Sequence, residues 1–135
     1  MVFKGYKLKV RCIDWEQEEY LGDFWNYISK YISKNKIVGL GMNWTKDNLY
    51  FEYALGVIGN DEVLKKLKQI DFSNTKFNVE YVEIKLPNEW DIFKGKLTEL
   101  KTIYEKIDNC SRKYDYELEY IDDLDNLEIK IHFVN

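Results

Sequence analysis

The sequence has few of the residue types on which most enzymes and metal sites depend. Its 135 residues include one histidine, one proline and two cysteines. His132 has no second ligand at metal-binding spacing, so we expect an exposed strand residue and no metal site. Cys12 and Cys110 fit no Cys-x-x-Cys pattern, which indicates two reduced thiols in a cytoplasmic protein. The acidic segment 122–126 lacks the glycine and the distal glutamate of a calcium loop and is read as a solvated turn.

Other absences narrow the functional class. The sequence contains no glycine-rich phosphate loop, nucleophile elbow or paired-carboxylate signature, so we assign no catalytic residue and expect no cofactor. Arg11 and Arg112 are the only arginines and the net charge is −4, which disfavours nucleic-acid binding by this chain alone. No apolar run approaches the roughly 18 residues of a membrane span, and no signal-peptide pattern opens the chain. A binding protein is favoured over an enzyme.

Aromatic residues are abundant instead. Eleven Tyr, seven Phe and four Trp make up 16% of the chain. This number of rings is more than a small core needs, and ring faces also bind flat or cationic ligands. We therefore expect some of these rings to line a cavity.

Hydrophobic periodicity predicts the order strand, helix, strand, strand, twice over. Alternation typical of strands covers residues 7–15, 36–44, 49–58, 77–86, 114–121 and 127–134, and 89–93 is extended after Pro87. Helical stripes cover residues 21–32, 63–70 and 97–107, and Asn60 or Asp61 is placed to cap the middle helix.

The repeated order indicates an internal duplication of about 65 residues within one domain. We interpret residues 1–135 as a single domain with pseudo-repeats at about 1–70 and 71–135. The predicted fold class is α+β, a tandem strand-helix-strand-strand repeat that forms one antiparallel sheet with two main helices on one face. A groove is expected near the pseudo-twofold axis between the repeats.

Three short segments carry a family resemblance. Residues 51–57 (FEYALGV) match a strand pattern of Phe, an acid, Tyr, two free positions, Gly and Val. Residues 84–93 (IKLPNEWDIF) match a segment with Ile-Pro, then Trp or Tyr, then Phe, and Leu118-Glu119-Tyr120 matches a strand with Glu and Tyr. With the helix that holds Phe24-Trp25 and the strand 37–40, these segments resemble the GyrI-like small-molecule-binding domains, an integron-associated effector-binding-like family, over nearly the whole chain.

The resemblance implies a groove lined with aromatic rings around one buried glutamate, which is Glu119 here. Members of that family include effector domains of multidrug-responsive and AraC-type transcription regulators, free-standing ligand-binding proteins, a gyrase inhibitor and hydrolases of strained cyclopropane-bearing toxins. The chain departs from the pattern at Phe133, where the family usually has Pro, and in residues 61–77, which are longer and more helical. Neither departure touches the proposed pocket glutamate.

The expected ligand-binding residues come from these motifs. They are Glu119, Trp90, Tyr53, Trp44, Trp25, Phe51 and Phe93. Each has a plainer alternative: Glu119, like Glu117, would be solvated on a half-exposed strand, and the rings would be ordinary core, above all Trp25. Trp44 is predicted to share a strand face with Met42 and Leu40.

Three functions follow as hypotheses. The first is binding of hydrophobic, cationic aromatic small molecules, either by a free-standing protein or by a regulator's effector domain, because several rings and one carboxylate accept many flat cations. The second is hydrolysis of a strained electrophile with Glu119 as the base. The third is a gyrase-inhibitor-like module with a protein partner. The ligand and the oligomeric state stay open.

Overall fold

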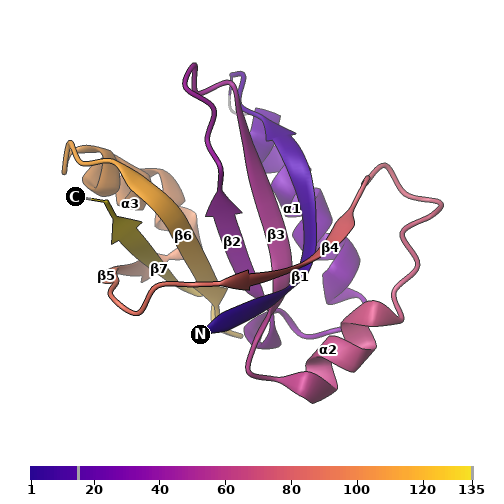
Figure 1. Cartoon of the computed structure of the whole chain (residues 1–135). Coiled ribbons are helices and arrows are strands. Elements are labelled where there is room, and N and C mark those ends of the chain that lie inside the picture. The colour runs from indigo at the N-terminus through magenta and orange to yellow at the C-terminus, as the bar shows by residue number, and fades with distance from the viewer. Residues whose placement is uncertain (15, 135) are drawn as a thin grey trace.

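One antiparallel sheet organises the fold of residues 1–14 and 16–134, the part of the chain that this computed structural model describes (Figure 1). Its seven strands lie in the order β4-β1-β3-β2-β6-β7-β5, and the sheet does not close into a barrel. The strands are β1 (Val2–Arg11), β2 (Val38–Met42), β3 (Tyr50–Ile58), β4 (Glu80–Lys85), β5 (Asp91–Lys96), β6 (Tyr114–Ile121) and β7 (Asn126–Phe133). The helices are α1 (Glu16–Ser29), α2 (Asp61–Lys68) and α3 (Leu100–Asp108), with 3-10 turns at η1 (Lys34–Lys36) and η2 (Leu97–Glu99). The predicted α+β class is confirmed.

The sheet contains two strand-helix-strand-strand units that meet in its middle. The unit β1-α1-β2-β3 forms the order β1-β3-β2, and the unit β5-α3-β6-β7 forms its mirror order β6-β7-β5. β2 pairs antiparallel with β6, with Leu40 opposite Leu118, so the pseudo-twofold axis passes between them. The second unit therefore begins at β5, and the prediction that strand 77–86 opens it is wrong. The internal duplication itself stays a prediction.

The strand β4, which the prediction assigned to the second unit, is an additional edge strand. β4 pairs with β1 at one edge of the sheet, whereas β5 pairs with β7 at the other edge. The chain between them crosses the sheet face opposite the helices (Figure 1). Pro87 ends β4 in this crossing, where Leu86 is buried against Phe3 and Leu40. A strand break in the sequence thus marks a change of sheet edge.

The two faces of the sheet follow from strand periodicity. In β3, Tyr53 and Leu55 point toward the helices, where they pack with Phe24 and Ile28 of α1. In the second unit, Ile129 of β7 and its neighbours pack against α3 in the same way. Residues of opposite parity, such as Leu40, Ala54 and Leu118, form a third buried cluster on the other face. The predicted placement of both main helices on one face is confirmed.

Local signals account for most element boundaries. The Asn60 side chain accepts a hydrogen bond from the Val63 backbone N–H at 3.1 Å, so Asn60 caps α2 rather than Asp61. The strand predicted over 7–15 is instead β1 at Val2–Arg11, since the chain leaves the sheet before Asp14, whose φ of 51° is left-handed. Trp15 of that prediction lies outside the described residues.

Candidate functional site

A cavity of about 480 Å³ lies between α1 and α3, over the central strands β2 and β6. One wall comes from α1, the other from η2 and α3, and the floor from β3 and β6. The lining residues are Cys12, Gln17, Glu18, Leu21, Gly22, Trp25, Trp44, Phe51, Tyr53, Leu97, Leu100, Tyr104, Asp108, Tyr114, Glu117, Glu119 and Ile121. This volume is typical of sites for drug-sized ligands.

Two glycines of β2 make room for the polar centre of the cavity. Gly39 and Gly41 pair with Glu119 and Glu117 across the β2–β6 junction. A Cβ on Gly39 would lie 2.2 Å from the Tyr53 hydroxyl, and one on Gly41 would lie 2.8 Å from Glu117 Cγ. The absence of side chains at these two positions therefore lets the two polar groups lie over the strand.

Two carboxyl groups meet at one hydroxyl in this cavity. Tyr104 Oη of α3 lies 3.0 Å from Glu117 Oε1 and 3.1 Å from Glu119 Oε1. Glu117 and Glu119 are two residues apart on β6, so they point to the same face, which is the helix face. Glu117 is only 5% exposed, and its second oxygen, Oε2, has no hydrogen-bond partner. The centre of the cavity is an acidic pair short of hydrogen-bond donors.

A second hydroxyl supports Glu119 from the β3 side. Trp25 Nε1 of α1 donates to Tyr53 Oη at 2.8 Å, and the Tyr53 hydroxyl hydrogen-bonds Glu119. Because the indole occupies an acceptor position of the Tyr53 oxygen, the hydroxyl hydrogen is free to point at the carboxylate. Burial and the nearby glutamates raise the pKa of Tyr53 and of Tyr104 well above the usual value, so both remain donors.

Burial holds protons on the acidic pair near neutral pH. Loss of water around the carboxyls, followed by the charge of Glu119, raises the pKa of Glu117 to about 8. Burial also raises the pKa of Glu119 to about 7, although the Tyr104 and Tyr53 hydroxyls oppose the shift. The cause is mainly desolvation, which disfavours the charged form of an acid.

The rest of the lining adds negative rather than positive charge. Glu18 of α1 and Asp108 of α3 also line the cavity, and the described lining residues include no Lys, Arg or His. Burial raises the pKa of Asp108, and its charge in turn raises that of Glu117. A cation entering this cavity meets carboxyl groups and ring faces without a competing protein cation.

Five of the seven residues expected from sequence line this cavity: Glu119, Tyr53, Trp44, Trp25 and Phe51. Trp44 reaches it by a route that the sequence does not reveal. Asn43 has a φ of 56°, which breaks the alternation of β2, so Trp44 turns to the helix face while Met42 stays on the other. The prediction that Trp44 shares a face with Met42 and Leu40 is wrong. Trp44 instead stacks on Phe51, with ring centroids 5.6 Å apart.

Trp90 and Phe93 lie elsewhere. Trp90 belongs to the crossing segment on the opposite face, where its Nε1 donates to the Pro87 carbonyl at 3.0 Å. Its ring meets His132, which is half-buried and hydrogen-bonded to Asp115 at 2.6 Å rather than exposed as predicted. Phe93 packs at the margin of the α3 core. Neither ring lines the cavity, because the motif segment 84–93 changes sheet edge.

The sequence prediction missed Glu117 and Tyr104 as site residues. Glu117 follows from the strand period, because residues i and i+2 share a face and Glu119 was already assigned to the pocket. Tyr104 is harder to find, since it sits in an apolar helix stripe whose other members, such as Ile103 and Ile107, are core. Only the packing of α3 against β6 shows that its hydroxyl faces two acids.

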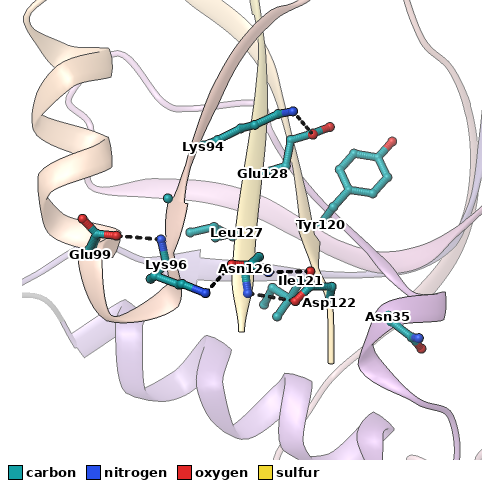
Figure 2. A pocket seen from close by; sticks show the side chains of 11 residues that line it. Asn35, Lys94, Lys96, Glu99, Tyr120, Ile121, Asp122, Asn126, Leu127 and Glu128 are labelled. Carbon is teal, nitrogen blue, oxygen red and sulfur yellow. Dashed lines mark hydrogen bonds and ion pairs between the residues drawn. The ribbon is translucent and has the colours of Figure 1, made fainter. Parts of the chain in front are cut away.

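A larger hollow of about 720 Å³ lies near the β6–β7 turn, and its polar groups already pair with one another (Figure 2). Lys96 Nζ donates to Asn126 Oδ1 at 2.6 Å, and Lys94 forms an ion pair with Glu128 at 3.5 Å. Asn126 in turn donates to Asp122 at 2.9 Å, which closes the predicted acidic turn. The buried side-chain atoms without a hydrogen-bond partner, Gln17 Oε1 and Glu117 Oε2, belong to residues that line the acidic cavity, which is therefore the stronger candidate site.

The described residues contain no cluster of three or more His, Cys, Asp or Glu side chains that could hold a metal ion. None of the helices in residues 1–14 and 16–134 is long and apolar enough to cross a membrane.

Comparison with known proteins rests on structure. No family model matches the chain, and no curated protein matches it by sequence. An integron cassette protein from the mobile metagenome of Vibrio cholerae is similar, with a TM-score of 0.60, 16% identity, and coverage of 99% of this chain and 90% of that one. SAV2435, solved bound to tetraphenylphosphonium, has a TM-score of 0.58 at 14% identity, with coverage of 100% and 89%.

A third similar structure is a Staphylococcus aureus MU50 protein assigned to bacterial transcription regulation. Its TM-score is 0.53 at 14% identity, and the alignment covers 100% of this chain and 93% of that one. At these identities the three likenesses show a shared fold over the whole described chain.

Proposed function

We propose that this chain is a GyrI-like binding protein for hydrophobic, cationic aromatic small molecules, which it holds in the cavity between α1 and α3. The observation that carries the proposal is the acidic pair of buried Glu117 and half-buried Glu119, set among aromatic rings with no basic residue in the described lining. A buried carboxylate without a cation is costly, so this arrangement favours a ligand that brings a positive charge.

The rings supply the remaining affinity. Trp25, Trp44, Phe51 and Tyr53 line the cavity, and Trp44, Phe51 and Tyr53 form a continuous set of ring contacts. Each cation–π contact contributes about 0.5–2 kcal/mol, and ring burial adds about 25 cal/mol per Å². A few such contacts with one charge pair are enough for micromolar affinity without shape-specific hydrogen bonds. Such a site accepts many flat cations.

The comparisons support the same ligand class. SAV2435, which has the same fold, is solved with tetraphenylphosphonium, a lipophilic cation with four phenyl rings. The S. aureus MU50 protein supports a link to transcription regulation. We place this chain with the effector-binding members of the family, as a free-standing protein or a regulator's effector domain.

The direct test compares two ions of one shape and opposite charge. Tetraphenylphosphonium and tetraphenylborate differ in charge but present the same four rings. We expect tetraphenylphosphonium to quench the fluorescence of the cavity tryptophans with a micromolar dissociation constant, and tetraphenylborate to bind at least tenfold more weakly. Equal binding of the two ions would contradict an electrostatic site.

Two variants locate the charge that selects the cation. Glu119→Gln keeps the side-chain shape and should weaken tetraphenylphosphonium about tenfold or more. Glu80→Gln is the matched control, because it removes one acidic charge from the edge strand β4, where Glu80 is exposed and does not line the cavity. It should leave the affinity within about twofold, since exposed charges are screened by salt. Equal losses in both variants would point to net charge rather than the cavity.

A hydrolytic activity is the second candidate. Burial places the pKa of Glu119 at about 7, the range in which a carboxylate activates water at neutral pH. The Tyr53 and Tyr104 hydroxyls hydrogen-bond Glu119 and would hold it in place as that base. Product formation from a cyclopropane-bearing substrate, lost in Glu119→Gln, would establish it. If the substrate is recovered unchanged when it is in large excess over the protein, the hydrolytic activity is ruled out and only binding is supported.

A further inference from the structure

We propose that the cavity selects aromatic cations that carry N–H donors, such as amidinium ions, and that these ligands displace a proton held between Glu117, Tyr104 and Glu119. This inference rests on the proposed cation binding and specifies which cations fit best. Glu117 is then the residue that decides between donor-bearing and quaternary cations.

Counting hydrogens leads to the shared proton. Tyr104 has one hydroxyl hydrogen, yet its oxygen lies within hydrogen-bond distance of two carboxyl oxygens. If both acids were ionised, one of the two contacts would place the hydroxyl oxygen against a carboxylate with no hydrogen between them. With one acid protonated, that acid donates to Tyr104 Oη, and Tyr104 donates to the other carboxylate. The empty site therefore needs an extra proton to satisfy its geometry.

Unpaired acceptors in the walls point to a ligand that donates hydrogen bonds. Glu117 Oε2 is buried without a partner on the β6 side, and Gln17 Oε1 is buried without a partner on α1. A buried acceptor without a donor costs about 1–3 kcal/mol, and more when it is charged. A quaternary or phosphonium cation brings charge but no N–H group, so it leaves these acceptors unsatisfied.

An aromatic amidinium ion supplies both the positive charge and the hydrogen-bond donors that the empty cavity lacks. Its planar cationic group carries four N–H hydrogens and is attached to a flat ring that the cavity aromatics can stack on. Donation to both carboxylates replaces the shared proton, which leaves to solvent, and the single positive charge of the ligand takes the place of the charge that the proton carried. No bond is made or broken other than the O–H of the released proton.

The other groups that face the acidic pair favour the replacement of the shared proton by a cationic ligand. Asp108 of α3 and Glu119 both raise the pKa of Glu117, while the Tyr104 hydroxyl lowers it. Glu18 of α1 and Cys12 also line the site, and burial and the Glu117 charge raise the pKa of the Cys12 thiol, which keeps it neutral. Since the described lining has no basic group, the shared proton neutralises one of the two carboxylates in the empty site.

The experiment compares two monocations with the same ring system. The probes are 2-naphthamidine, which is an amidinium ion at neutral pH, and N,N,N-trimethyl-2-naphthylammonium, which has no N–H group. In calorimetric titrations at pH 7 we expect the amidinium to bind about tenfold tighter, as charge-assisted hydrogen bonds allow. Titrations in phosphate and in Tris, which differ in ionisation enthalpy, should show a proton released to the buffer by the amidinium. The amidinium affinity should rise from pH 6 to 8 and then level off.

Glu117→Gln tests the assigned residue and keeps its shape. This variant should reduce the preference for the amidinium to about twofold and abolish the proton release, while Glu80→Gln should change neither. Retention of the preference in Glu117→Gln, or equal wild-type affinities with no proton released, would overturn the inference while leaving cation binding intact. Failure of both cations to bind would instead contradict the proposed function itself.

Discussion

Single residues at the cavity centre trade stability for binding. Glu117 and Glu119 have pKa values raised to about 8 and about 7, whereas a solvated glutamate titrates near 4.5. Between those limits the folded protein binds more protons than the unfolded chain, so raising the pH favours unfolding. The stability gained from these protonated acids is complete below about pH 4.5 and is lost as the pH rises through 7 to 8.

We therefore expect the melting temperature to fall by at least about 5 °C between pH 5.5 and 8.5. Glu117→Gln should flatten this profile and melt above the wild type at pH 8.5, because the amide supplies the missing donor without a charge. Circular dichroism melts at several pH values measure the effect. Burial tends to raise the pKa of Glu52, but its hydrogen bonds to Lys7 and Asn43 lower that pKa below the usual value, so Glu52 stays ionised over this range and Glu52→Gln should not flatten the profile. A wild-type melting temperature that is constant over this range would refute the assignment.

Gly39 gives a second residue-scale prediction. An alanine Cβ there would lie 2.2 Å from the Tyr53 hydroxyl and 3.1 Å from the Trp25 ring, so Gly39→Ala should destabilise the protein by about 2 kcal/mol. Gly22 of α1 is the matched control, since a Cβ at that position meets nothing within 4 Å. Gly22→Ala should stabilise the helix by up to about 1 kcal/mol. Urea unfolding measures the free energy of unfolding of both variants. Equal changes in the two variants would show that the groups around Gly39 move aside to accept the added methyl group.

At the scale of elements, α2 depends on the residue that caps its N-terminus, Asn60. Asn60 accepts from the Val63 backbone N–H, whereas Asp61 stands in the first turn, where only the helix dipole favours its charge. Asn60→Ala should cost about 1 kcal/mol. Asp61→Ala should cost about half as much or less. Urea unfolding at pH 7 would distinguish them, and a larger loss in Asp61→Ala would mean that the cap is Asp61.

Element type follows from sequence here more readily than pairing does. β6 matches the predicted strand 114–121, and the stripe of Val63, Leu64 and Leu67 predicts α2, because each pattern is set by neighbouring residues. The pairing of β4 with β1 depends on a partner about eighty residues away, and no local pattern specifies it. The turn of Trp44 is equally hidden, since alternation cannot report that Asn43 has a positive φ.

At the scale of the whole molecule, the sheet separates a binding face from a structural face. The motif resemblance places Glu119, Tyr53 and Trp90 in one groove, but the sheet divides them. Glu119 and Tyr53 share the helix face because β3, β2 and β6 are paired in register there. Trp90 lies on the other face because the chain must cross the sheet to reach its far edge. Sequence motifs specify the order of side chains along the chain, but not the face of the sheet on which each one lies.

Because Trp25 and Trp90 lie on opposite faces of the sheet, the same substitution at each should affect a different property, ligand affinity at Trp25 and stability at Trp90. Trp25→Phe removes the indole N–H that Tyr53 accepts, so the Tyr53 hydroxyl is less well aimed at Glu119. Tetraphenylphosphonium affinity should fall about three- to tenfold. Trp90→Phe removes only the hydrogen bond to the Pro87 carbonyl on the far face, so it should lower stability by about 1 kcal/mol and leave the affinity within twofold. Fluorescence titration still reports binding in Trp90→Phe, because Trp25 and Trp44 remain in the cavity. A loss of affinity in Trp90→Phe as large as that in Trp25→Phe would mean that the ligand binds on the other face of the sheet.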